Sequence, residues 1–373
     1  MEKKNRGQRI GKPDRKDDRK NRTPGYRLKD KEPETNAMEF INIVDRFSKK
    51  RICVIGDIIA DVFIYGKPYR LSREAPVVVI RHENEIVCPG SAGNTINNLL
   101  ALGAHVYPLG FIGNDSPGER LMGYFARFKN IALDGIIRYD GETVTKTRIL
   151  AGDTHTSKQQ VIRIDKDTGD RPTSVARQLL MKRLKEIAHA VDAFILSDYG
   201  HGTIDEEIVD FLRHEAEKKI VVGDSRYNLR AFKGITIITP NESEAYALCS
   251  AGEDDDIEVV GRRIMGFMDI SALLITRGNR GMSLFLKDGS IHHIPISGTD
   301  DVTDVTGAGD TVCATLTLSL ASGASYLTSS MIANYAAGVV VMKRGTATVS
   351  PEELKREIEI GMERDGQDSK GYQ

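Results

Sequence analysis

The chain alternates between short apolar segments and longer segments in which apolar residues recur at helical spacing. The apolar segments have the length of buried strands, and most of them end on a polar residue. They cover residues 51–56, 193–196, 220–222, 235–239 and 272–276, and helical segments lie at 174–190, 206–218 and 242–250. Continuous apolar strands that alternate with helices indicate a mainly parallel sheet with helices on both faces. Ligands of such sheets bind beyond the carboxyl ends of the strands, so the polar residues there are site candidates.

Two regions depart from this alternation. Residues 76–80 and 85–88 have the pattern of a strand pair, and so have residues 136–137 and 146–149. Strands inserted into a doubly wound domain are candidates for a lid over the site, and an edge extension of the main sheet fits the same pattern. We therefore predict a doubly wound α/β domain with a small β lid, formed from about residues 70–90 and 136–165.

The two ends of the chain differ from its middle in composition. Residues 1–37 carry 13 Lys and Arg against seven Asp and Glu, although the whole chain of 373 residues has a net charge of −1. A segment with so few apolar side chains is predicted to be a disordered basic tail, and a nucleic-acid or membrane tether is the alternative. Residues 38–360 are expected to form the domain, and the charged, glycine-containing residues 361–373 a frayed tail.

Cysteine usage and hydropathy bear on the location of the protein. Cys53, Cys88, Cys249 and Cys313 are scattered and form no Cys-x-x-Cys pair, which favours reduced thiols over disulfides or structural zinc. The N-terminal segment has no apolar signal region, and no apolar run reaches the roughly 18 residues that span a bilayer. These features predict a cytoplasmic protein that is not bound to a membrane, and the near-neutral net charge argues against a nucleic-acid partner.

The strongest candidate for chemistry is the segment 301–311, which opens the apolar run 312–320. Gly307 and Gly309 leave the first N–H groups of a helix unobstructed, and those groups with the helix dipole form an anion site. The neighbouring Asp304, Thr306 and Asp310 add carboxylates and a hydroxyl group, as phosphoryl transfer requires; a plain capping role for Asp310 is the alternative. The P-loop and dinucleotide fingerprints are absent from this segment.

Further polar residues follow other strands. Asp57 and Asp61 suit sugar hydroxyl groups or cap a local turn, and Asn94 fits substrate binding or helix capping. Asn241 and Glu244 have the spacing of a capping box, and their oxygens also suit a Mg²⁺ ion that keeps its waters.

Two more groups bear on ligands. Thr276, Gly278 and Gly281 form a glycine turn that suits nucleotide phosphates or an ordinary hairpin. Lys146, Arg148, Lys158 and Arg163 lie in or just after the second lid-like segment, where arginine forks suit a phosphate group. The alternative is that these four are solvated strand residues. The cations predict a phosphorylated sugar as substrate.

Residues 50–358 together resemble the ribokinase-like (PfkB) carbohydrate kinases. Within that family they are similar to the heptose-7-phosphate kinase domain of ADP-heptose synthases. The resemblance rests on Gly56-Asp57 with Asp61, Ser72 to Val77, Pro89-Gly90 with Asn94, Ser197 to Gly200, Thr239 to Glu244, Asp304 to Thr311, Ala333 to Val341 and Gly345 to Leu354. The sequence departs from the usual heptose kinase pattern at Ser91, Gly93, His201, Ser225 and Arg226.

The resemblance implies an ATP- and Mg²⁺-dependent kinase of a sugar or sugar phosphate, with D-glycero-D-manno-heptose 7-phosphate as the leading substrate and a homodimer formed through the β lid. Kinases of ribose, fructose, fructose phosphate or a nucleoside are alternatives, as is a non-catalytic nucleotide- or sugar-binding regulator. The implied catalytic groups are the base Asp310 and the amides of Gly307, Ala308 and Gly309. Asn241 and Glu244 would organise Mg²⁺. The residues expected near the nucleotide are Thr276, Gly278, Gly281, Asp304, Thr306 and Asn334, and those near the sugar are Asp57, Asp61, Gly90, Asn94, Arg148 and Arg163.

Overall fold

The computed structural model describes residues 37–152, 158–167, 169–252, 254–297, 303–343 and 345–368. These residues belong to one compact unit that begins at Ala37, so the predicted basic tail lies outside them except for its last residue. The helices are α1 (Ala37–Val44), α2 (Ala92–Ala101), α3 (Ser116–Phe125), α4 (Ser174–Ile187), α5 (Glu206–Glu215), α6 (Glu242–Cys249), α7 (Ile257–Met268), α8 (Ala308–Ala321), α9 (Tyr326–Val341) and α10 (Pro351–Asp368). Short 3₁₀ helices are η1 (Phe47–Lys49), η2 (Leu133–Gly135), η3 (Ala188–Ala190), η4 (Leu229–Phe232) and η5 (Gly278–Arg280).

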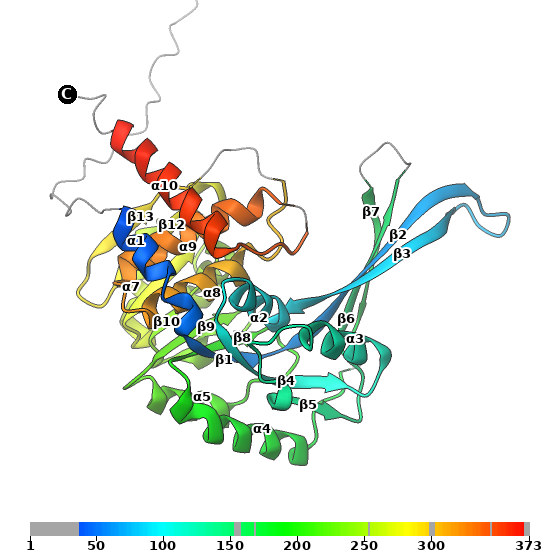
Figure 1. Ribbon diagram of the computed structural model, residues 1–373, viewed down its shortest axis with the longest axis horizontal. Coiled ribbons are helices and arrows are strands. Elements are labelled where there is room, and N and C mark those ends of the chain that lie inside the picture. The colour runs from blue at the N-terminus through cyan, green and yellow to red at the C-terminus, as the bar shows by residue number, and fades with distance from the viewer. Residues whose placement is uncertain are drawn as a thin grey trace, which may run out of the picture. The chain divides into compact units, whose positions relative to one another are not determined.

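A nine-stranded sheet runs through the middle of the domain (Figure 1). Its order from one edge to the other is β13 (Ile291–Ile294), β12 (Met282–Leu286), β11 (Ala272–Thr276), β10 (Ile237–Ile238), β9 (Ile220–Ser225), β8 (Ala193–Asp198), β1 (Arg51–Gly56), β4 (His105–Gly113) and β5 (Ile136–Tyr139). Neighbours from β11 to β5 are parallel, and β12 and β13 are added as antiparallel strands. The predicted, mainly parallel sheet is confirmed.

Helices cover both faces of this sheet, as Figure 1 shows with α4 and α5 on one side and α8 and α9 on the other. Successive side chains of β1 enter two separate apolar cores. Ile52 and Val54 pack in the core that holds α2, α8 and α9, and Cys53 and Ile55 in the core of α4, α5 and α7. Because both faces are buried, the strands are continuously apolar up to their polar ends instead of alternating between apolar and polar residues. This continuous apolar pattern made the strands predictable from the sequence.

A second, smaller sheet stands away from the main one and has the order β3, β2, β6, β7. It is formed by β2 (Ile58–Leu71), β3 (Val78–Ser91), β6 (Thr145–Ala151) and β7 (Gln159–Lys166). We call it the small sheet. The predicted pairing of residues 76–80 with 85–88 is wrong, because residues 78–91 form one continuous strand that pairs antiparallel with β2. The polar residues 81–84 mark no turn, since most of this strand is at least partly exposed and admits polar side chains on either face.

The second predicted strand pair is also wrong. Residues 136–139 form β5, which extends the edge of the main sheet beside β4, and β6 pairs with β2 and β7 instead. Only residues 145–151 and 159–166 of the predicted segment 136–165 therefore belong to the small sheet, and residues 153–157 lie outside the described residues. The alternative interpretation, an edge extension, applies to residues 136–139.

Helix α10 corrects the expectation of a frayed end after residue 360. It continues to Asp368, and Leu354 and Ile358 on it are buried in the core. Gly361 serves close packing here, because a Cβ atom at this position would lie 2.3 Å from Cε1 of Tyr335 in α9. Residues 369–373 lie outside the described residues.

Two predictions about composition can be compared with the described part of the chain. None of its helices is both long and apolar enough to pass through a bilayer. All four cysteines are free, and Cys53 and Cys313 are buried, so disulfides play no part in holding this fold.

Candidate active site

Asp310 lies in the first turn of α8 and is 5% exposed. Its Oδ2 accepts a hydrogen bond from Nδ2 of Asn94 at 2.7 Å. Its Oδ1 accepts two more, from the hydroxyl groups of Tyr199 at 3.0 Å and Thr95 at 3.2 Å. A carboxylate has about four acceptor positions, so one remains open, on Oδ2. A hydroxyl group that approaches Oδ2 can therefore still donate its proton to Asp310.

The surroundings of Asp310 change its acidity. The pKa of Asp310 is raised from 3.8 to about 6, chiefly by burial; the hydrogen bonds from Asn94, Tyr199 and Thr95 oppose the rise, and the nearby charge of Asp61 adds to it. A carboxylate with this pKa is ionised at neutral pH and is a stronger base than an exposed aspartate, as a general base requires.

The turn before Asp310 is built from glycine and from hydrogen bonds. Gly307 has φ = 80°, a left-handed conformation that glycine adopts without strain, and a Cβ atom there would lie 2.4 Å from Nδ2 of Asn94. The N–H of Ala308 donates to the carbonyl oxygen of Val305, so this amide is used within the turn. The next N–H groups, of Gly309 and Asp310, belong to the first turn of a helix, where no intrahelical acceptor exists. They are the amides best suited to hold an anion.

Asp304 holds this turn rather than pointing away from it. Its Oδ1 accepts the N–H of Thr306 at 2.9 Å, and its Oδ2 accepts the N–H of Gly345 at 3.0 Å. Although burial would raise its pKa, these hydrogen bonds and the charge of Arg148 keep the pKa below its usual value. Asp304 and Thr306 thus shape the turn before α8, and anion binding by this turn and contact of the two residues with a nucleotide stay predictions.

Asp57 has a similar positioning role for a second loop. Its Oδ2 accepts the N–H groups of Tyr199 at 2.8 Å and His201 at 3.0 Å, and its Oδ1 accepts that of Thr203 at 3.1 Å. The side chain is 2% exposed. Asp57 therefore fixes the loop that presents Tyr199 to Asp310, and sugar binding by Asp57 itself stays a prediction.

Sequence reasoning missed Tyr199 and Thr95 as members of the site. Tyr199 follows the carboxyl end of β8, where ligands of parallel sheets bind, and Thr95 adjoins the candidate Asn94. Position at a strand end was thus the available signal for Tyr199. Burial and the charges of Asp310 and Asp224 raise the pKa of Tyr199 well above 10, so its hydroxyl group stays protonated and donates to Asp310.

A cavity of about 690 Å³ opens beside this constellation. Its lining brings together the predicted turn and the predicted metal and nucleotide residues. The lining residues from these predictions are Gly307, Gly309, Asn241, Glu244 and Thr276, and Tyr199, Asp224 and Arg226 join them. One cavity thus connects the anion-binding turn with the start of α6, as transfer between two bound substrates requires.

Asn241 and Glu244 form a complete capping box at the start of α6. Oδ1 of Asn241 accepts the N–H of Glu244, and Oε2 of Glu244 accepts the N–H of Asn241, both at 2.9 Å. Burial raises the pKa of the Glu244 carboxyl group, against the effect of the hydrogen bond from Asn241. The capping interpretation is therefore confirmed, and metal binding by Asn241 and Glu244 stays a prediction.

The charges around this cavity fit a magnesium ion. Burial and the charges of Asp310 and Glu244 raise the pKa of Asp224 well above 3.8, which reflects a negative potential that a divalent cation would relieve. Within the described ranges, no cluster of three or more His, Cys, Asp or Glu side chains could enclose a metal. Mg²⁺ usually keeps several waters and binds one or two carboxylates together with phosphate oxygens, so the sparse donor set suits it.

Three further nucleotide candidates have structural contacts. Gly281 closes the β11–β12 hairpin with φ = 77°, and a Cβ atom there would lie 2.0 Å from the carbonyl oxygen of Ile294. Gly278 has φ = 57° and open space around its Cα. Nδ2 of Asn334 in α9 donates to the carbonyl oxygen of Pro295 at 2.7 Å. The hairpin interpretation of 276–281 is confirmed, and nucleotide contact by these residues stays a prediction.

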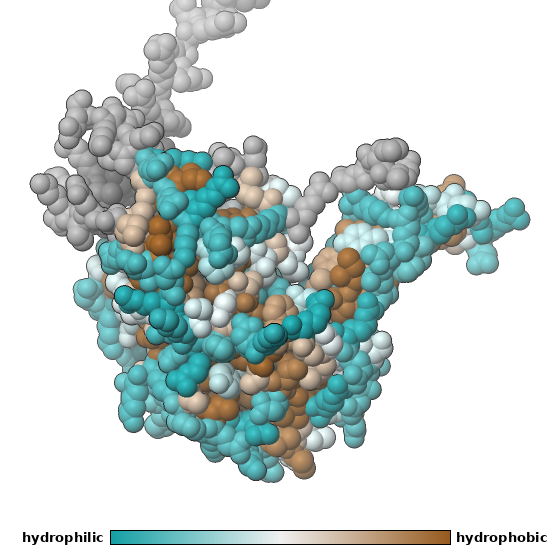
Figure 2. Space-filling view, viewed as in Figure 1, coloured by the Kyte–Doolittle hydropathy of each residue, from teal (hydrophilic) through white to brown (hydrophobic). Residues whose placement is uncertain are grey.

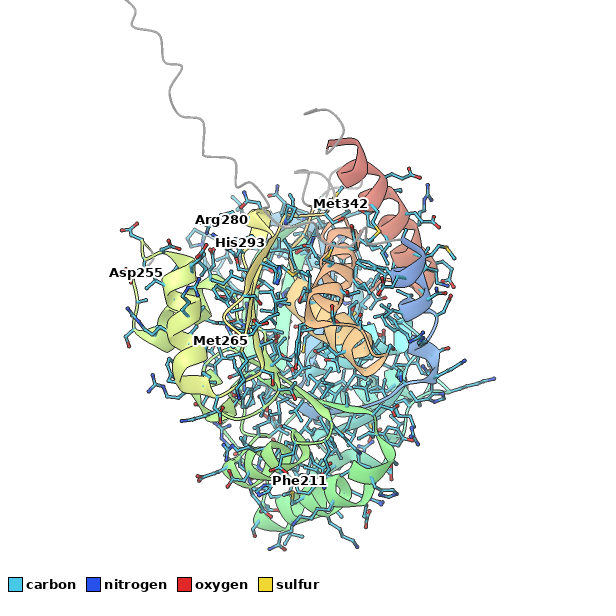
Figure 3. All side chains as sticks on the ribbon, turned by 90° about the vertical axis from the view of Figure 1, so that its left-hand side faces the viewer. Phe211, Asp255, Met265, Arg280, His293 and Met342 are labelled. Atoms are coloured by element: carbon cyan, nitrogen blue, oxygen red, sulfur yellow. The ribbon has the colours of Figure 1, made fainter. Side chains whose placement is uncertain are left out.

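Arginines tie this hairpin to α6. Nε of Arg277 donates to Oε1 of Glu242 at 2.9 Å, and Arg280 forms an ion pair with the same carboxylate. Figure 3 labels Arg280 of this hairpin and His293 of β13, the strand that pairs with β12. These contacts hold Thr276 at the cavity beside the capping box.

The small sheet contributes the remaining candidates. Nη1 of Arg148 donates to Oδ1 of Asp61 at 2.6 Å in a largely buried ion pair. A Cβ atom on Gly90 would lie 2.4 Å from Oδ2 of Asp61, so glycine leaves room for this carboxylate. Arg163 binds Asp165 through two hydrogen bonds of 2.7 Å. The charge of Asp61 also acts on Asp310, whose pKa it raises.

Comparisons with known proteins show the family to which this chain is similar. Residues 49–353 match the pfkB family of carbohydrate kinases. The chain is 38% identical over 308 residues to the bifunctional protein HldE of Geobacter sulfurreducens, which covers 81% of this chain and 61% of the relative. It is 38% identical over 318 residues to the bifunctional protein HldE of Methylococcus capsulatus, and this match covers 84% of this chain and 64% of the relative. The chain thus spans about three fifths of the length of these curated relatives.

Solved structures are similar over most of this chain. Ribokinase from Arabidopsis thaliana, complexed with ribose and ATP, superposes with a TM-score of 0.64 at 18% identity and covers 83% of this chain and 99% of that one. Phosphofructokinase-2 from Escherichia coli, in complex with fructose-6-phosphate, gives 0.65 at 15% identity, with 84% and 99% covered. At such identities the similarity concerns the fold, and the predicted ribokinase-like fold is confirmed.

Proposed function

Because the chain belongs to the pfkB family of carbohydrate kinases, we propose that it transfers a phosphoryl group from ATP to a hydroxyl group of a phosphorylated sugar. The observation that carries this proposal is the buried carboxylate of Asp310 beside the first N–H groups of α8, at a cavity that reaches the capping box of α6. A base, an anion site and oxygen ligands around one cavity are the parts that phosphoryl transfer needs.

The geometry supports definite roles for residues of this chain. The acceptor hydroxyl group binds at the open position on Oδ2 of Asp310, next to Asn94. As its oxygen bonds to the transferred phosphorus and the bond to the leaving ADP oxygen breaks, the proton passes to Oδ2. The N–H groups of Gly309 and Asp310 stabilise the negative charge on the transferring group. Tyr199 and Thr95 hold Oδ1 and thereby orient the base.

Glu244 and Asn241 would hold Mg²⁺ through its waters, and the ion would supply charge neutralisation at the phosphates. Thr276, at the end of β11, lines the same cavity and would contact the nucleotide. The same role is proposed for Gly278, Gly281 and Asn334, on the resemblance alone.

D-glycero-D-manno-heptose 7-phosphate, converted to the 1,7-bisphosphate, is the substrate that we favour. Two features support it: the motifs shared with heptose-7-phosphate kinases, and 38% identity to bifunctional HldE proteins over most of this chain. Ribose, fructose and fructose phosphate are the alternatives, because ribokinase and phosphofructokinase-2 share the fold.

We further propose that the small sheet acts as a lid and forms the interface of a homodimer. We also propose that the enzyme is cytoplasmic. Apolar side chains exposed on this sheet support a partner surface, and Figure 2 shows an apolar area there. These side chains are Tyr69, Leu71, Val78, Ile86, Val161, Ile162 and Ile164. Ile162 and Ile164 lie two residues apart on β7 and share one face, and exposed apolar groups that lie together mark interaction surfaces.

The test is ATP turnover with a panel of sugars and sugar phosphates, for the unaltered protein and for Asp310→Asn. Loss of the base should lower kcat by about 10²- to 10⁴-fold while the KM values change little. Asp288→Asn, which removes an exposed carboxylate from the β12–β13 turn, is the matched control. Near-normal turnover by Asp310→Asn would refute the assignment.

A further inference from the structure

The cations of the small sheet differ in how they are neutralised. Arg148 is paired with Asp61, and Arg163 with Asp165. Lys146 lies between these two carboxylates in the register of β2, β6 and β7, yet it forms no salt bridge among the described residues. One face of the small sheet carries two residues from each of these strands, because the positions on each strand are two residues apart and the register aligns them. The six residues are Asp61, Phe63, Lys146, Arg148, Arg163 and Asp165.

Lys146 lies close to the catalytic carboxylate. Its Nζ is 5.5 Å from the centroid of the Tyr199 ring, and the hydroxyl group of that ring donates to Asp310 at 3.0 Å. One aromatic side chain therefore separates the ammonium group from the base. Burial lowers the pKa of Lys146, and the charges of Arg163 and Arg226 lower it further against the opposing effect of Asp61 and Asp165.

Arg226 approaches the same place from the main sheet. It directly follows β9, where its N–H donates to the carbonyl oxygen of Asp198 at 3.0 Å, and it lines the cavity together with Tyr199, Gly307 and Gly309. Within the described part of the chain, Arg226 also forms no salt bridge. Arg226 thus lines the cavity, and Lys146 lies beside the cavity-lining Tyr199; neither forms a salt bridge within the described ranges. Such an arrangement is electrostatically unfavourable until an anion lies between them.

We propose that Lys146 and Arg226 form the subsite for the phosphate group that the acceptor sugar already carries. This rests on the proposed function and names the residues that decide between phosphorylated and free sugars. Arg148 and Arg163, which the sequence favoured, are neutralised by Asp61 and Asp165 and contribute less to this choice. A lysine ammonium and an arginine fork on either side of a dianion form charge-assisted hydrogen bonds that a free sugar cannot replace.

The test compares Lys146→Gln and Arg226→Gln with the unaltered protein, using D-glycero-D-manno-heptose 7-phosphate and fructose 6-phosphate and the corresponding free sugars as acceptors. Each variant should raise the KM for a phosphorylated acceptor by about 10- to 100-fold, with the KM for ATP and the constants for free sugars within about two-fold. Lys146→Arg should restore most of the affinity. Lys67→Gln removes a lysine of β2 that pairs with Glu83, and it is the control for a charge lost elsewhere on this sheet.

Several outcomes would overturn the proposal. An unchanged preference for phosphorylated acceptors in both glutamine variants would do so, and so would a raised KM for ATP alone, which would assign the two cations to the nucleotide phosphates. Calorimetric binding of the same sugar phosphates without ATP tests the subsite apart from turnover. Binding that is lost in both variants, from a protein that phosphorylates nothing, would support the subsite and refute the kinase. Equal binding by all variants would refute the subsite.

Discussion

Tyr199→Phe tests how the pKa of Asp310, the proposed base, is set. The substitution removes one hydroxyl group and keeps the ring that lies under Lys146. The lost hydrogen bond, 3.0 Å long, stabilises the ionised form of Asp310, so its removal must raise the pKa of this carboxyl group above the present value of about 6.

The size of the effect follows from the kind of hydrogen bond. A hydrogen bond to a charged group contributes about 1.5–3 kcal/mol, and 1.36 kcal/mol corresponds to one pKa unit, so the pKa should rise by roughly one to two units. The ionised fraction of Asp310 would then fall by about an order of magnitude at pH 6.5 and hardly change at pH 8.5.

The assay is the pH dependence of kcat/KM for the acceptor, which reports ionisations of the free enzyme. The midpoint of the acidic limb should move from near 6 to between about 7 and 8. Tyr246→Phe is the matched control, since the hydroxyl group of Tyr246 bonds the carbonyl oxygen of Asp255 near the exposed start of α7. A midpoint that stays in place or falls would refute the role assigned to Tyr199, and an equal loss of activity at every pH would indicate a purely structural effect.

Two further predictions concern stability and the glycine turn. Because the folded-state pKa of Asp310 is raised from 3.8 to about 6, ionisation above pH 6 costs the fold about 3 kcal/mol that is absent below pH 3.8. Asp310→Asn should therefore be more stable than the unaltered protein in urea unfolding at pH 8, with a difference that shrinks as the pH falls from 6 to 4; a pH-independent difference would contradict this linkage. Gly307→Ala places a Cβ atom 2.4 Å from Nδ2 of Asn94 at φ = 80°, so kcat should fall at least about ten-fold and the melting temperature should drop. Gly123→Ala in α3, where a Cβ atom meets no atom within 4 Å, is the control, and equal kinetics of the two variants would disprove the constraint.

Most of the parallel strands of the main sheet and the glycine turn before α8 could be predicted from the sequence alone, whereas β4 was not predicted and β5 was assigned to the lid. Strands β1, β8 and β11 were recognisable because burial on both faces makes every position apolar, and a continuous apolar run is visible without any partner. The start of α8 could also be predicted, because the glycines Gly307 and Gly309 before an apolar run are a local signal of a helix start. The small sheet was predicted in outline only, because β2 and β3 carry polar residues on both partly exposed faces and so lack a clear period.

Tertiary structure decided which side chains act together. Tyr199 and Asp310 are 111 positions apart and meet because parallel β8 and the start of α8 converge at one edge of the sheet. Likewise, the register of β6 on β2 places Lys146 and Arg148 on the same face as Asp61, where Arg148 pairs with this carboxylate and Lys146 lies beside Tyr199. Local patterns record whether a position is buried, whereas a hydrogen bond or ion pair depends on register and on the packing of distant elements. The long-range topology therefore determined the acidity of Asp310 and the placing of the cations around it.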